Sequence, residues 1–286
     1  MTIRVLLAAS VALLITLTGY ADAEKPLKIL FLSKSSGFEH SVIKRENGQP
    51  SLVDRVLTAL APKLNAEVVC TKDADMFTPD GLKAYDVIIF YTTGDLTQPS
   101  EDGGKPMPPD GQQVLLDWIK AGGGFVGYHS ASDSFHSNAS GVTPYVEMIG
   151  GEFETHGKQF KGRLRVVSPG HPAIASLQDG YELWDEWYIN KNINRDAMHV
   201  LALLELGKER QRQPDKYNVP DYPIIWCREY GKGRVLYNGL GHREDVWESD
   251  AFQKIVVDNI LWAAGKGAAM AEPNYHKVVP KEIPAE

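Results

Sequence analysis

Residues 86–91 read DVIIFY, a short run that is apolar on both alternating faces after its first residue. Such a run is typical of a strand in the middle of a parallel sheet, where both faces are covered. Residues 28–33, KILFLS, form a similar run and lead into Ser35-Ser36-Gly37, which predicts a turn. We therefore expect a parallel sheet at the core of the molecule.

The segments around these runs alternate between helical and extended patterns. Residues 51–61 have apolar side chains on one helical face, and residues 66–69 then return as a strand. A second helix is predicted over residues 111–121, before a strand at residues 125–128. Repeated strand–helix–strand units imply right-handed crossovers. The predicted fold class is α/β, with a doubly wound, mostly parallel sheet covered by helices on both faces.

The second half of the chain predicts shorter strands and a closing helix. The strands are expected at residues 163–167, 199–204, 223–228 and 234–237. The last two are separated by a hairpin-type turn, and the helix has Phe252, Ile255 and Ile260 on one face. We expect one domain over residues 24–266, and the composition of residues 267–286 predicts a loose tail.

The first 23 residues have the pattern of an export signal. Arg4 supplies a positive charge, residues 5–17 are almost entirely apolar, and Ala21-Asp22-Ala23 matches a cleavage site. The apolar run is shorter than the roughly 20 residues that a membrane-spanning helix needs. We expect cleavage, and a mature protein that is periplasmic or secreted.

Composition excludes several classes of protein. The formal net charge is −7, and the basic residues form no stripe that would neutralise phosphates, so nucleic acid is not an expected partner. No basic amphipathic helix favours a membrane surface, and no stable membrane insertion is expected. Cys70 and Cys227 are the only cysteines. They are expected to be buried thiols rather than a disulfide framework.

Four histidines follow predicted strands, at the sheet edge where doubly wound folds bind ligands. They are His40, His129, His136 and His242. A shared site is one interpretation, and unrelated surface or helix-capping histidines are the other. Residues 127–131, GYHSA, have the spacing of a nucleophile elbow with histidine at the nucleophile's position. Ser130 is therefore not expected to act as a serine nucleophile.

A divalent metal such as zinc is a further expectation from the same residues. His129, Asp133 and His136 have the spacing i, i+4, i+7, which would place them on one face of a helix. Imidazoles with a carboxylate suit zinc. His156 could add a ligand. The alternative is that Asp133 caps a helix and His136 is solvated.

Residues 185–188, DEWY, combine acidic and aromatic side chains. A carboxylate between Trp184 and Trp187 would be desolvated, its pKa would rise, and it could serve as a general acid or base. Aromatic faces beside carboxylates also suit a sugar ring. The alternative is a strand edge with ordinary core tryptophans.

The order and spacing of several motifs between Leu27 and Gly265 resemble the ThuA-like family, named for trehalose utilisation. The motifs are residues 37–41 (GFEHS), 127–133 (GYHSASD), 150–151 (GG), 170–172 (GHP), 185–188 (DEWY) and 231–242 (GKGRVLYNGLGH). The resemblance implies a flavodoxin-like, class I glutamine amidotransferase-like fold, here without the catalytic cysteine, and a role in carbohydrate catabolism. It also implies site positions at His40, His129, Glu186, Tyr188 and His242.

The leading hypothesis is an exported enzyme that acts on a disaccharide, glycoside or keto-sugar, a small-molecule carbohydrate. His129, Glu186 and Tyr188 would be catalytic. His40, His129 and His242 would hold a divalent metal, with His136 and His156 as further candidates. Asp133, Asp185 and Trp187 would contact the substrate.

Two alternatives differ in class. One is a non-catalytic sugar-binding or scaffold protein on a degenerate amidotransferase fold. The other is a glycoside hydrolase that pairs Glu152 or Glu154 with Glu186. A homo-oligomer is compatible with each of these hypotheses.

Overall fold

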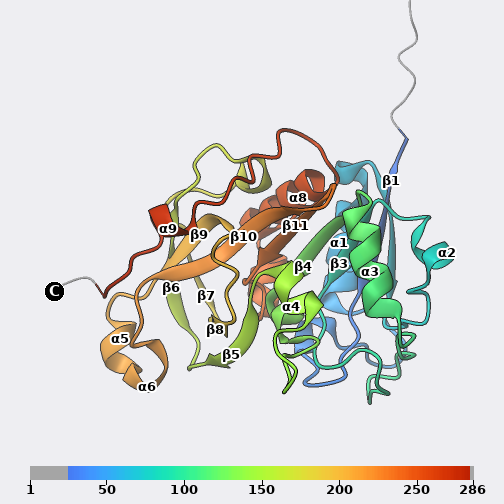
Figure 1. Cartoon of the computed structure of the whole chain (residues 1–286), viewed down its shortest axis with the longest axis horizontal. Coiled ribbons are helices and arrows are strands. Elements are labelled where there is room, and N and C mark those ends of the chain that lie inside the picture. Colours follow the sequence, from blue (N-terminus) through green and yellow to red (C-terminus); the bar gives the residue numbers. More distant parts are fainter. Residues whose placement is uncertain (1–24, 284–286) are drawn as a thin grey trace, which may run out of the picture.

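The computed structural model describes residues 25–283, and these residues form an α/β sandwich around one large sheet (Figure 1). The sheet order is β2-β1-β3-β4-β11-β10-β9-β6-β7. A separate two-stranded ribbon pairs β5 with β8. The strands are β1 (Leu27–Leu32), β2 (Ala66–Thr71), β3 (Val87–Phe90), β4 (Gly124–Tyr128), β5 (Glu152–His156), β6 (Phe160–Val166), β7 (Glu182–Asp185), β8 (Tyr188–Lys191), β9 (His199–Glu205), β10 (Tyr222–Tyr230) and β11 (Gly233–Asn238).

The first five strands of this order pair in parallel, and the rest extend the sheet with antiparallel pairs. The parallel half has the order 2-1-3-4-5 of flavodoxin-like folds when β11 is counted as the fifth strand. This order brings the carboxyl ends of β1, β4 and β11 to one edge of the sheet. The predicted α/β fold class is confirmed.

Helices cover both faces of the parallel half, and each face has its own apolar core. Side chains of α1 and α8 pack on one face, and side chains of α3 and α4 pack on the other. The helices are α1 (Leu52–Leu64), α2 (Pro79–Leu82), α3 (Gly111–Lys120), α4 (Pro144–Ile149), α5 (Glu209–Arg212), α6 (Pro214–Tyr217), α7 (Glu244–Glu248), α8 (Asp250–Ala263) and α9 (Tyr275–Val278). Short 3-10 turns are η1 (Ser41–Ile43), η2 (His129–Asp133) and η3 (Pro172–Ile174).

The segment after α8 is held against the sheet, whereas its composition predicts a loose tail. The Asn274 side chain accepts a hydrogen bond from the Val200 amide at 2.6 Å and donates one to its carbonyl at 3.0 Å. The His199 ring donates to the Glu272 carbonyl at 2.6 Å. Tyr275, Val278 and Val279 also pack against the apolar core. Composition could not reveal this, because a few specific hydrogen bonds and three separated apolar side chains hold the segment.

Two predictions concern the membrane and the N-terminus. No helix between residues 25 and 283 combines the length and the apolar character that a membrane crossing requires. The predicted export signal, residues 1–23, lies outside the described residues.

His171 links the stability of the fold to pH. Its Nδ1 accepts the Ala173 amide at 3.1 Å and caps η3, so this nitrogen must be unprotonated. Burial, and then the neighbouring His199, lowers the pKa of His171 to about 4. The unfolded chain binds this proton below about pH 6.5, while the folded chain resists it until about pH 4. Stability from this group is therefore complete above pH 6.5 and is lost as the pH falls.

The variant His171→Asn tests this link, because asparagine can keep the cap but cannot titrate. For the wild type we expect the free energy of unfolding to fall below pH 6.5, with His171 contributing up to about 1.4 kcal/mol per pH unit. The variant is expected to have a shallower slope in urea unfolding measured from pH 7 to pH 5. Equal slopes in the two proteins would contradict the assignment.

Candidate functional site

His129 stands at a sharp turn directly after β4. The strand ends at Tyr128, η2 begins at His129, and the φ angle of His129 is +41°. Residues with a β-carbon rarely adopt this left-handed conformation, which is costly and tends to occur at functional sites. The chain thus makes a strand-to-helix elbow, with an imidazole on the residue at its apex.

Small neighbours and three hydrogen bonds hold this turn in place. A β-carbon on Gly127 would lie 3.0 Å from the Ala131 methyl group, so the elbow leaves little room there. The Tyr237 hydroxyl donates to the His129 carbonyl at 2.7 Å and lies 3.1 Å from the Ser132 hydroxyl. His129 Nδ1 donates to the Gly239 carbonyl at 3.2 Å. The last bond fixes the tautomer in which Nε2 has a free lone pair.

The strain at His129 gives a test by paired substitution. His129→Ala keeps the β-carbon that disfavours a positive φ, whereas His129→Gly removes it. We expect the glycine variant to be more stable than the alanine variant by up to about 1 kcal/mol in denaturant unfolding. Ser132, inside η2, is the control position, and there we expect the alanine variant to be more stable than the glycine variant. If alanine is the more stable residue at both positions, the turn at His129 is unstrained.

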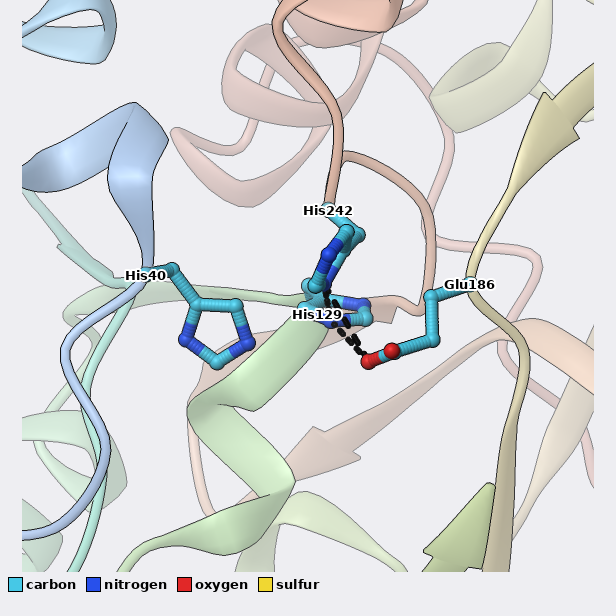
Figure 2. Close-up of side chains that lie close together, drawn as sticks. All are labelled: His40, His129, Glu186 and His242. Atoms are coloured by element: carbon cyan, nitrogen blue, oxygen red, sulfur yellow. Dashed lines mark hydrogen bonds and ion pairs between the residues drawn. The ribbon is translucent and has the colours of Figure 1, made fainter. Parts of the chain in front are cut away.

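Four side chains from distant parts of the chain converge beside this elbow (Figure 2). His40 comes from the loop after β1, His242 from the loop after β11, and Glu186 from the link between β7 and β8. One nitrogen or oxygen atom from each of these residues and from His129 lies within 4.8 Å of the other three. We call these four residues the His–Glu cluster.

Three of the atoms form a compact triangle. His242 Nδ1 lies 3.2 Å from His129 Nε2 and 3.2 Å from Glu186 Oε2. His129 Nε2 lies 3.6 Å from the same carboxylate oxygen. Figure 2 shows one ring nitrogen of His40 turned toward these atoms. The His–Glu cluster could therefore hold a metal ion.

The surroundings of the His–Glu cluster keep Glu186 ionised and His40 neutral, which are the protonation states that bind a metal ion. Although burial alone would raise the pKa of Glu186, the neighbouring imidazoles of His129 and His242 hold it well below its usual value. Burial, and then the proximity of the His129 and His242 imidazoles, lowers the pKa of His40 to about 2. Near neutral pH the site thus offers an anionic carboxylate and a neutral His40. The predicted rise in carboxylate pKa is wrong for Glu186.

Tyr188 and His156 flank the His–Glu cluster on the β5–β8 ribbon. The Tyr188 hydroxyl lies 3.3 Å from His40 Nε2, and its ring centroid is 4.1 Å from that of His129. Burial raises the pKa of Tyr188, so it stays a neutral phenol. His156 Nδ1 lies 3.2 Å from Glu186 Oε1, and the His156 side chain is 41% exposed. His156 thus marks the solvent side of the site.

Asp185 and Trp187, which were expected to contact the substrate, are both fully buried and make internal contacts. Asp185 accepts the backbone amides of Gly241 at 2.7 Å and His242 at 3.1 Å, so it positions the His242 loop. Burial raises the pKa of Asp185. The Trp187 indole lies in the core and donates to the Phe160 carbonyl at 2.9 Å.

His136 and Asp133 form a separate group with Glu152. His136 lies 2.6 Å from Asp133 and 2.9 Å from Glu152, and neither acid belongs to the His–Glu cluster. A helix that would align His136 with His129 does not continue past Asp133, because Ser134 is extended and Phe135 has a φ of +51°. The chain therefore turns His136 toward β5.

Glu152 is poorly suited to pair with Glu186 as a glycoside hydrolase would require. Its carboxylate is buried and bonded to His136, Ser137 and Asn192. Although burial alone would raise it, these hydrogen bonds lower the pKa of Glu152 to about 2. A carboxylate held this way has no free oxygen for a substrate. The alternative pairing of Glu154 with Glu186 stays a prediction.

Two phenylalanines beside the His–Glu cluster were not among the site residues predicted from the sequence. Phe38, two residues before His40, is 68% exposed, and its ring lies edge-on to His40 at 5.0 Å. The Phe153 ring lies 4.2 Å from the Tyr188 ring. Phe38 could have been found from its place in the motif GFEH, whereas Phe153 becomes visible only through the pairing of β5 with β8.

The thiols take no part in the site. Neither Cys70 nor Cys227 forms a disulfide, and burial raises the pKa of both, that of Cys70 to about 12. Buried thiols of this kind are poor nucleophiles. Cys227 is fully buried, as predicted, and Cys70 is half-buried.

Solved structures with the same fold include two ThuA-like proteins. The protein from Bacteroides uniformis is 20% identical, with a TM-score of 0.66 over 88% of this chain and 96% of that chain. The protein from Parabacteroides merdae is 19% identical, with a TM-score of 0.63 over 91% and 95%. A beta-galactosidase from Bacillus circulans sp. alkalophilus matches 87% of this chain with 32% of its own, at 11% identity and a TM-score of 0.51. No curated protein matches the chain.

These likenesses establish the fold, and the family follows from the sequence. The family model for ThuA, described as trehalose utilisation, matches residues 28–263. This range contains the elbow, the His–Glu cluster and the whole sheet apart from the first residue of β1. The match supports a broadly carbohydrate-related role, and the chain belongs to the ThuA family.

Proposed function

We propose that this protein is an exported, divalent-metal-dependent enzyme that acts on a disaccharide, glycoside or keto-sugar. One observation carries the proposal, namely the triangle formed by His129 Nε2, His242 Nδ1 and Glu186 Oε2. Zinc bonds of 2.0–2.1 Å in a tetrahedron place neighbouring ligand atoms about 3.3 Å apart. The three edges here are 3.2, 3.2 and 3.6 Å.

The chemistry of the donors also fits zinc. Imidazole nitrogens with one carboxylate oxygen are ligands that zinc accepts. The His129 ring donates its other nitrogen to the Gly239 carbonyl, which is the outer contact that metal-binding histidines usually make. His40 Nδ1 is buried without a hydrogen-bond partner among the described residues. A cation at the opposite nitrogen, Nε2, would offset part of the cost of burying this ring but would not pair Nδ1.

A cation bound here would supply Lewis-acid polarisation of a sugar carbonyl or hydroxyl, provided that it accepts the sugar oxygen as a fifth ligand beside the four side chains. The ligating roles of His129 and Glu186 leave other groups to move protons. His156 is partly exposed beside Glu186 and can carry a proton to and from solvent. The neutral Tyr188 phenol can donate a hydrogen bond to an oxygen held at the cluster.

The substrate class rests on the family and on the aromatic rim. Phe38 and Phe153 lie beside the His–Glu cluster through His40 and Tyr188, and a sugar ring can stack on such faces. The family match to trehalose utilisation points to carbohydrates. Export rests on residues 1–23, and N-terminal sequencing of the secreted or periplasmic protein should begin near Glu24.

Turnover of defined sugars tests the proposed enzyme. The zinc-loaded protein is incubated with trehalose, its keto derivatives and aryl glycosides, and the products are followed by mass spectrometry. We expect a product that disappears with a chelator and in the variant His242→Ala. The control His276→Ala changes an exposed histidine outside the cluster and should leave turnover intact. Saturable sugar binding without any product would instead support a non-catalytic binding protein.

A further inference from the structure

The four members of the His–Glu cluster do not contact one another equally. Glu186 forms ion pairs with His129 and His242, and those two rings lie 3.2 Å apart at their nearest nitrogens. His40 forms no ion pair with Glu186 in residues 25–283, although an atom of each lies within 4.8 Å of the other. A regular zinc tetrahedron would bring these atoms to about 3.3 Å, well within ion-pair range. His40 therefore stands back from the position of a fourth tetrahedral ligand.

The inner nitrogen of His40 has two candidate partners for a single lone pair. His40 Nε2, the ring nitrogen turned toward the other three side chains in Figure 2, lies 3.3 Å from the Tyr188 hydroxyl. An imidazole nitrogen has only one lone pair, so Nε2 can bind a cation or accept the phenol hydrogen, but not both. Tyr188 is thus an alternative partner for His40 when His40 does not bind a cation.

The outer nitrogen of His40 also differs from those of the other two rings. Metal-binding histidines almost always donate their second N–H to an acceptor. His129 has such an acceptor in the Gly239 carbonyl, and the His242 side chain is 21% exposed to solvent. His40 Nδ1 is buried, and no group in the described part of the chain pairs with it. When Nε2 binds a cation, Nδ1 carries the proton, and an unpaired buried donor weakens that bond. His40 is therefore the weakest of the three imidazole ligands.

We propose that His40 is an exchangeable ligand, which an oxygen atom of the substrate replaces. This inference rests on the metal site proposed above and describes how that site opens. The bond between His40 Nε2 and the cation breaks, its electron pair stays on Nε2, and Nε2 then accepts the Tyr188 hydroxyl hydrogen. The substrate oxygen enters as a fifth ligand and stays when His40 leaves. Three permanent protein ligands with one exchangeable position are typical of catalytic zinc sites, whereas four permanent ligands are typical of structural ones.

X-ray absorption with acetohydroxamate, a small probe that binds zinc through its oxygen atoms, tests the exchange. We expect three imidazoles in the zinc-loaded protein and two after the probe is added. The probe-bound spectrum should match that of probe-bound His40→Ala, whereas the probe-free spectra of the two proteins should differ. Three imidazoles in both states, or a wild type that does not bind the probe, would overturn the exchange but leave the metal site intact. A probe-free spectrum without imidazoles would overturn the metal site itself.

Zinc affinity gives an independent test that does not need the probe. His40→Ala should lower the affinity by less than about tenfold, whereas His242→Ala should lower it by more than about 100-fold. Competition with a chromophoric chelator measures both, and circular dichroism shows that each variant is folded. Losses of equal size would show that His40 is a permanent ligand and would overturn the proposal.

Tyr188 acts through His40, so it is a positioning residue in this exchange. Tyr188→Phe should lower the affinity of the zinc-loaded protein for acetohydroxamate about threefold to tenfold, the effect of one hydrogen bond, without lowering zinc affinity. In the His40→Ala background the loss should be smaller, because no displaced imidazole remains to be held. Tyr85→Phe is the control, because Tyr85 precedes β3 at the end of the strand away from the site. A loss of the same size in both backgrounds would contradict the exchange.

Discussion

Replacement of Glu186 by glutamine is expected to lower the affinity of the protein for Zn²⁺ by more than about 100-fold. Loss of an outer-shell partner alone costs a metal site 10- to 100-fold, and Glu186 is placed as a direct ligand. The substitution preserves the size of the side chain but removes the single negative charge among three imidazoles. The fold should survive, because Glu186 lies at the site rather than in either apolar core.

Competition with a chromophoric chelator measures this change. Glu182→Gln is the matched control, because it removes an exposed carboxylate four residues earlier on β7. Its zinc affinity should equal that of the wild type. Equal affinities in all three proteins would mean that zinc binds elsewhere, and the proposed metal site would have to be abandoned.

Asp102→Ala is expected to produce the largest loss of stability, about 3–5 kcal/mol, because it removes the buried carboxylate beside Lys34 and leaves Lys72 with only the partly exposed Glu39. The Asp102 side chain is fully buried, lies 3.5 Å from the Lys72 ammonium, and accepts the backbone amides of Ser35 and Gly104. The Lys34 side chain, also fully buried, donates to the Gly104 carbonyl at 2.8 Å. This network holds the polar loop between β3 and α3 against the end of β1.

Urea unfolding and zinc affinity together report this effect. Lys72 also bonds Glu39, the residue before His40, so the variant should weaken zinc binding as well as the fold. Asp80→Ala is the control, because it removes the acid of an exposed ion pair with Lys83 and should change little. A wild-type unfolding curve for Asp102→Ala would show that the buried lysines need no counter-charge.

The fold class could be predicted from the sequence, because a continuous apolar run indicates a strand that is buried on both faces. The runs at residues 28–33 and 86–91 correspond to β1 and β3, and residues 125–128 lie within β4. Once these strands are parallel, side chains that follow them must gather at one edge. That inference gives His40, His129, His136 and His242 as candidates, and the structure brings all of them except His136 together.

Other parts of the site depended on contacts that a linear pattern does not encode. The left-handed backbone at Phe135 sends His136 away from His129, and no periodicity predicts a single dihedral angle. Trp187 lies beside Glu186 in the sequence, yet alternation along an extended chain turns its indole into the core. The pairing of Asp102 with Lys72 joins residues 30 positions apart.

The central claim is that three imidazoles and one carboxylate bind a single divalent cation. An X-ray absorption spectrum of the zinc-loaded protein tests it most directly, because imidazole rings give a distinctive scattering pattern. The account predicts four ligands at about 2.0–2.1 Å, with the signature of three imidazoles. A spectrum of hydrated zinc with oxygen ligands alone, or one with sulfur ligands, would contradict it.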